Sequence, residues 1–132
     1  MLYPGYKTDR DEDGQTPLMC WIKERLYEAI PDCLLYPGCQ TDRDEDGKTP
    51  LMLWVEHRLD DDPIPDCLFY DGCQNDRDVD GDTLLMYWVK YCPGSESIPK
   101  ELLYDGYQTD KGYGSRTPLM NWIAFRSNDP IP

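Results

Sequence analysis

The sequence predicts an α-dominated repeat solenoid, in which stacked helix–turn–helix units are connected by polar hairpins or turns. Three landmarks recur in a fixed order along the 132 residues, with a period of 33 or 34 residues. Each copy has Thr-Pro-Leu-Met (Thr-Leu-Leu-Met in the third) with Trp two residues later, then Ile-Pro, and then an apolar residue, Tyr, any residue and Gly. The threonines are Thr16, Thr49, Thr83 and Thr117; the Ile-Pro pairs start at Ile30, Ile64, Ile98 and Ile131; the third landmark starts at Leu2, Leu35, Phe69 and Leu103.

The first helix of each unit is predicted from its start signal and its apolar spacing. Thr16 is a suitable N-cap, and Pro17 occupies the first helical position, where a missing N–H costs nothing. Apolar residues then recur at spacings of three and four, at Leu18, Met19, Ile22 and Leu26. A helix with this stripe buries one face, and stacked copies of the unit complete one another's core.

A second, shorter helix is expected after the Ile-Pro landmark. By the same start logic it begins at Pro31 and runs through Cys33–Tyr36, and Gly38 is expected to end it in a left-handed conformation. The stretch from Gln40 to Gly47 is rich in Asp and Gly, which predicts an exposed turn or hairpin.

The period and motifs resemble the ankyrin repeat. The segment Asp46–Met52, Asp-Gly-Lys-Thr-Pro-Leu-Met, is similar to that family's Asp-Gly-x-Thr-Pro-Leu-His, and Leu34–Gly38 is similar to the end of its second helix. The sequence departs from the family where Met replaces His and where Trp with Ile or Val replaces a pair of alanines. The resemblance implies a single array over residues 1–132, with approximate units 1–38, 39–72, 73–106 and 107–132, of which the first and last are incomplete.

Charge and composition narrow the classes of function. Twenty-six Asp and Glu against thirteen Lys and Arg give a net charge of −13, which disfavours nucleic acid and anionic membranes as partners. No apolar run is long enough to span a bilayer, and the start of the chain lacks a signal peptide's features. His57, the single histidine, has no Ser or Cys beside it to form a nucleophile–base pair. We therefore expect no enzymatic activity and no cofactor.

The six cysteines are expected to be reduced. Cys33 and Cys67 are equivalent positions one unit apart, as are Cys39 and Cys73, and stacked helices lie farther apart than a disulfide allows. Free thiols are typical of a cytoplasmic, reducing compartment.

Three of the hairpins contain Asp-x-Asp-x-Asp-Gly, which is the first half of an EF-hand calcium loop. The bidentate Glu expected at loop position 12 is replaced by Cys20, Leu53 or Tyr87. Turn chemistry is therefore the favoured role of these aspartates, and weak calcium binding is an alternative. The aspartates are Asp9, Asp11, Asp13, Asp42, Asp44, Asp46, Asp76, Asp78 and Asp80.

The predicted function is a non-enzymatic scaffold for protein–protein interaction. The resemblance implies that a protein partner binds the hairpin tips and the exposed face of the first helices, where residues differ between copies. An alternative is a structural, self-assembling repeat segment of a longer array or filament. Trp122 and Ile123 lack the second helix that should follow them, and Leu2 and Tyr3 lack the first helix that should precede them, so chains can stack head to tail. The predicted partner-binding residues are Glu12, Gln15, Lys23, Glu24, Glu45, Lys48, Glu56, His57, Val79, Asp82, Lys90, Tyr91, Tyr113, Arg116 and Phe125.

Overall fold

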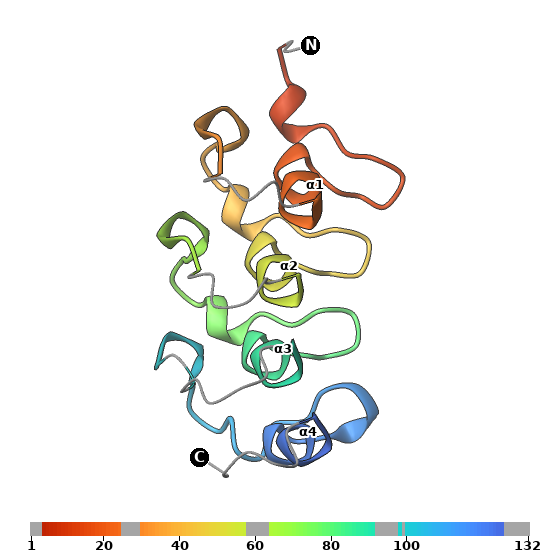
Figure 1. Ribbon diagram of the computed structural model, residues 1–132, viewed down its shortest axis with the longest axis vertical. Helices are drawn as coiled ribbons and strands as arrows, with labels where there is room; N and C mark the ends of the chain where they lie inside the picture. Colours follow the sequence, from red (N-terminus) through yellow and green to blue (C-terminus); the bar gives the residue numbers. More distant parts are fainter. Residues whose placement is uncertain (1–3, 25–29, 58–63, 92–97, 99, 126–132) are drawn as a thin grey trace.

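Four short α-helices dominate the structure, a computed structural model that describes residues 4–24, 30–57, 64–91, 98 and 100–125. The helices lie one after another along the long axis of the molecule, and the loop before each one projects from the same edge (Figure 1). Across the described ranges the remaining regular structure consists of 3-10 turns and one isolated bridge, between Arg77 and Thr83. The predicted α-dominated class is confirmed. The helices are α1 Pro17–Glu24, α2 Pro50–Glu56, α3 Leu84–Tyr91 and α4 Pro118–Phe125.

The helices begin where the Thr-Pro-Leu-Met landmark predicts. The Thr49 hydroxyl accepts a hydrogen bond of 3.3 Å from the backbone N–H of Met52, and Pro50 is the first residue of α2. Thr16 and Thr117 accept the same bond from Met19 and Met120, at 3.4 and 3.3 Å. Each cap satisfies a donor that the first turn would otherwise leave unpaired.

The core lies between successive helices, and α2 and α3 each pack against a different neighbour on either face. α1 packs on α2, α2 on α3, and α3 on α4. In α2 the residues Leu51 to Val55 are all buried, so the helix has apolar contacts on both sides. Such a helix depends on its neighbours, since seven residues are too few to form a stable helix alone.

The predicted second helix is wrong, and with it the helix–turn–helix form of the unit. Asp32–Leu34 forms a single 3-10 turn, and the following Leu35 is extended. The equivalent segments Asp66–Leu68 and Lys100–Leu102 are also single 3-10 turns. The stretch is short, so the cost of nucleating a helix is not recovered, and a residue that precedes proline, as Tyr36 does, disfavours helical geometry. The predicted left-handed Gly38 is confirmed, with φ of +87°.

Candidate functional site

The hairpins before α1, α2 and α3 are held by their central aspartate. Oδ1 of Asp44 accepts hydrogen bonds from the backbone N–H groups of Asp46 and Lys48, at 2.9 and 3.0 Å. Asp11 and Asp78 accept the equivalent pairs of bonds in their own hairpins, each at 2.9 Å. These carboxylates are used as turn acceptors, which is the favoured sequence prediction for this position.

The second oxygen of the same aspartate meets the helix that follows. Oδ2 of Asp11 lies 3.6 Å from the Cys20 Sγ, and Oδ2 of Asp78 accepts a hydrogen bond from the Tyr87 hydroxyl. The N–H of Gln15 is the main cause that lowers the pKa of Asp11 below its ordinary value of 3.8. Among the described residues, no group of three or more Asp, Glu, His or Cys side chains is placed to hold a metal ion.

An arginine connects each hairpin to the next one. Nη1 of Arg10 donates to the carbonyl oxygens of Gly14 in its own turn and of Arg43 in the next hairpin, both at 2.6 Å. Its Nη2 lies 3.6 Å from the Asp42 carboxylate. Arg43 makes the equivalent bonds to Gly47, to Arg77 and to Asp76.

The third arginine repeats two of these contacts. Arg77 donates to Gly81 in its own turn at 3.0 Å, and it pairs with the Asp110 carboxylate of the next hairpin. We call Arg10, Arg43 and Arg77 with their acidic partners Asp42, Asp76 and Asp110 the arginine ladder. The arginine ladder was not among the sequence predictions, although an Arg recurs at the same position in three hairpins.

Hairpin tips also join through their backbones. The N–H of Glu45 donates to the carbonyl oxygen of Asp13, and the N–H of Val79 donates to that of Asp46, both at 2.9 Å. The tips are therefore ordered by their neighbours, which gives the outward side chains of Glu45 and Val79 fixed positions.

The predicted partner-binding residues divide by exposure. Gln15 and Asp82 are buried, so they are not surface positions as predicted, and the side chain of Phe125 lies outside the described residues. The half-buried members are Lys48, Glu56, His57 and Lys90. The exposed members are Glu12, Lys23, Glu24, Glu45, Val79, Tyr91, Tyr113 and Arg116.

The structure brings the hairpin and helix positions together within each layer. Lys48 Nζ lies 2.7 Å from a carboxylate oxygen of Glu56. Burial acts to lower the pKa of Lys48, but the hydrogen bond to Glu56 and the negative charges of the nearby carboxylates together raise it. In the next layer Asp82 takes the place of Lys48 and Lys90 takes the place of Glu56, so the acidic and basic residues are exchanged. Lys90 Nζ lies 3.0 Å from the Asp82 carboxylate. The two sets of predicted residues therefore form one continuous surface.

This surface becomes aromatic toward the C-terminal layers. The Lys90 Nζ lies 5.9 Å from the centre of the Tyr113 ring, and the Tyr113 N–H donates to Asp82 at 2.9 Å. Val79, Tyr91 and Tyr113 are 67%, 44% and 64% exposed. We call Val79, Tyr91 and Tyr113 the apolar patch.

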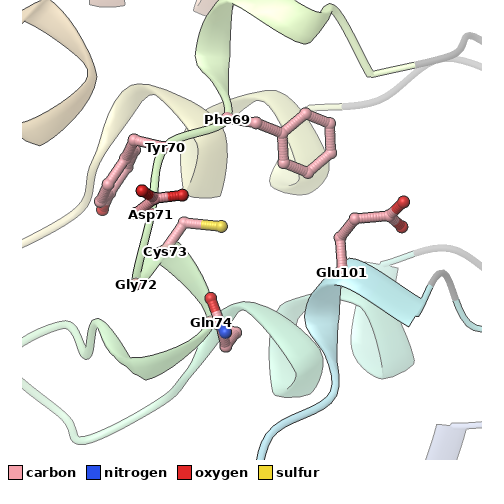
Figure 2. A pocket seen from close by; sticks show the side chains of 7 residues that line it. All are labelled: Phe69, Tyr70, Asp71, Gly72, Cys73, Gln74 and Glu101. Atoms are coloured by element: carbon pink, nitrogen blue, oxygen red, sulfur yellow. The ribbon is translucent and has the colours of Figure 1, made fainter.

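A cavity of about 410 Å³ lies on the other edge, and sequence reasoning did not find it. In Figure 2 the Cys73 thiol points toward the space between the Phe69 ring and the Glu101 carboxylate. An aromatic ring and a carboxylate facing one space suit a cationic side chain. The one sequence signal is Phe69, which stands where other copies have Leu. The cavity is lined by Phe69, Tyr70, Asp71, Gly72, Cys73, Gln74 and Glu101.

Four thiols of the described segments have raised pKa values. Burial raises the pKa values of Cys20, Cys39, Cys67 and Cys73, which keeps the thiols protonated and weakly nucleophilic. These four and Cys33 are free cysteines in the structure. The remaining cysteine, Cys92, lies outside the described residues.

In the described segments no helix has the length and apolarity needed to cross a membrane. A comparison with protein-family models and with curated proteins finds no match for this chain.

Proposed function

We propose that this chain is a repeat solenoid, similar to an ankyrin array with a reduced second helix, that acts as a non-enzymatic scaffold for a protein partner. The observation that carries the proposal is the apolar patch. Val79, Tyr91 and Tyr113 occupy positions that differ between copies and that the core does not use, yet each is a large apolar side chain exposed to solvent. Exposed aromatic residues on an ordered surface are typical anchors of protein interfaces.

The surroundings of the patch support a partner with basic groups. The chain carries a net charge of −13, and the exposed hairpin residues Glu12 and Glu45 extend the acidic surface from the patch toward α1. The Glu101 carboxylate lies beside an aromatic ring on the opposite edge. Complementary charge speeds the encounter between partners, whereas the apolar anchors supply most of the affinity.

The experiment compares the proteins captured by two surface variants. Tyr91→Ser with Tyr113→Ser removes two anchors. As a matched control, Asp32→Ser with Asp66→Ser changes two exposed residues of the 3-10 turns, which are not among the predicted partner-binding residues. We expect a partner held by the wild type and by the control variant to be lost from the double tyrosine variant, with affinity reduced at least about 30-fold, as two anchors imply. Equal retention on both variants would refute the patch as the binding site.

A cytoplasmic, reducing environment is part of the proposal. The five free cysteines among the described residues support it, since unpaired thiols are typical of such a compartment. A thiol reagent applied to freshly isolated native-source protein under denaturing, non-reducing conditions should label all six cysteines. Labelling of two or fewer would overturn the assignment.

A further inference from the structure

The last helix exposes the face that every other helix buries. Leu119, Met120 and Ile123 of α4 are 48%, 51% and 54% exposed. Their equivalents in α1, α2 and α3 are at most 2% exposed, because each packs on the helix of the following layer. The equivalents are Leu18, Met19 and Ile22, then Leu51, Met52 and Val55, then Leu85, Met86 and Val89.

In the first helix, the less buried residues lie at two other positions. Cys20 and Trp21 are half-buried, whereas the residues at these positions in later helices, such as Leu53 and Trp54, are buried. In α4 the same two positions, Asn121 and Trp122, are also buried. These two positions therefore face the preceding layer, and in α1 that side is only half-buried.

We propose that the exposed face of α4 binds this half-buried face of α1 in a second copy of this chain. The contact repeats the one that α3 makes with α4, since Leu119, Met120 and Ile123 occupy the positions of Leu85, Met86 and Val89. A second copy fits because its α1 supplies the matching side, with a Trp at the position of Trp122. The contact is head to tail and does not close, so copies add in a row.

Charge at the hairpins supports the same register. Within the chain a basic residue of one hairpin pairs with the first aspartate of the next, as Arg43 does with Asp76 and Arg77 with Asp110. Lys111 occupies the arginine position of the last hairpin, and Asp9 occupies the aspartate position of the first, and both are exposed. Stacking α4 on the second copy's α1 places Lys111 next to Asp9 of that copy.

Two variants that each block one face provide the test. Met120→Glu puts a charge on the α4 face, and Cys20→Arg puts one on the α1 face, where Asp11 is close enough to pair with it. Both positions are at least partly exposed, and circular dichroism with a thermal melt checks that each variant folds. Sedimentation velocity of the wild type should show an average sedimentation coefficient that rises continuously with concentration, whereas each variant alone should remain a monomer.

The decisive measurement is the mixture of the two variants. Each retains one working face, so the mixture should form a one-to-one dimer and stop there. A wild type that stays monomeric at millimolar concentration would refute the proposal. So would dimerisation of Cys20→Arg alone, because that result would indicate a symmetric α4-to-α4 contact.

A charge exchange tests the register. Lys111→Asp should weaken wild-type association at least tenfold at low salt, and adding Asp9→Lys to that variant should restore it. Failure of Asp9→Lys to restore association would contradict the head-to-tail register. The apolar patch is untouched by these changes, so partner capture and self-association can fail independently.

Discussion

The guanidinium of Arg43 donates a hydrogen bond of 2.7 Å to the carbonyl oxygen of Arg77, the residue that holds the same place one hairpin further along. The same nitrogen donates to Gly47 at 2.9 Å in its own turn, and the other terminal nitrogen lies 3.0 Å from the Asp76 carboxylate. One side chain therefore fixes the shape of its own hairpin and the distance to the next.

Removing this side chain should destabilise the stack. We expect Arg43→Ala to lower the free energy of unfolding by about 1 kcal/mol, a modest value because the guanidinium is partly exposed. Arg43→Lys keeps a charge for Asp76 but lacks the planar fork, so it should recover less than half of the loss. Urea denaturation followed by tryptophan fluorescence measures both variants, and full recovery by Lys would show that charge alone matters.

The close approach of neighbouring hairpins predicts different costs at two glycines. Both Gly38 and Gly47 have positive φ, +87° and +77°, which costs an Ala residue about 1 kcal/mol. A Cβ at Gly38 meets nothing within 4 Å, whereas one at Gly47 lies 3.0 Å from the backbone nitrogen of Val79. Gly47→Ala should therefore be more destabilising than Gly38→Ala by about 1 kcal/mol or more. Equal thermal shifts would mean that the hairpins can separate freely.

The burial of equivalent leucines predicts that a Leu→Ala substitution costs more stability in α2 than in α4. Leu51→Ala truncates a fully buried side chain and should cost about 2 to 5 kcal/mol of stability. Leu119→Ala changes the equivalent but half-exposed residue of α4 and should cost about 1 kcal/mol or less in dilute protein. Chemical denaturation of both variants at micromolar concentration decides the matter. Similar losses at the two positions would show that α4 is covered in the monomer.

Acid should weaken the ion pair between Arg77 and Asp110, the last pair of the arginine ladder. Burial would raise the pKa of Asp110, but hydrogen bonds from Arg77 and Tyr104 outweigh it and hold the pKa below the ordinary value of 3.8. A carboxyl with a lowered folded-state pKa stabilises the protein above its unfolded pKa, and that stabilisation is lost as the pH falls through the folded value. The coupling between Arg77 and Asp110 should therefore be stronger at pH 6 than near pH 2.

A double-mutant cycle with Arg77→Gln and Asp110→Asn measures this coupling at each pH. The coupling energy should fall steadily below about pH 4, where the carboxyl takes up its proton. A coupling that does not change between the two pH values would indicate that the pair contributes no net electrostatic stabilisation.

The first helices were predictable because their signals are local. Thr, Pro and the apolar spacing all lie within one turn or two of the helix they start, and Thr49 caps α2 as expected. The 3-10 turns were not predictable by the same reasoning. Pro31 is a suitable start for an α-helix and for a single 3-10 turn alike. Whether the turn continues into a helix depends on the nucleation cost and on packing beyond the segment.

The candidate surface was partly predictable for a similar reason. Comparing equivalent positions identified Val79, Tyr91 and Tyr113, and these are exposed. The same comparison selected Asp82, which is buried beneath Lys90 and Tyr113, because variation between copies does not reveal what a neighbouring hairpin covers. The arginine ladder joins residues 32 to 34 positions apart, and only the stacked arrangement brings them together.

The arginine ladder has a consequence for how such a chain can change in length. Arg10 and Arg43 bind the next hairpin through equivalent atoms, so a unit duplicated or removed as a whole leaves every remaining rung intact. A gain or loss of one or two residues inside a unit instead misaligns the arginine of that unit with its acceptors in the next hairpin. A change of length in whole-period steps therefore preserves the hydrogen-bond register between neighbouring hairpins, whereas a change of any other length disrupts it.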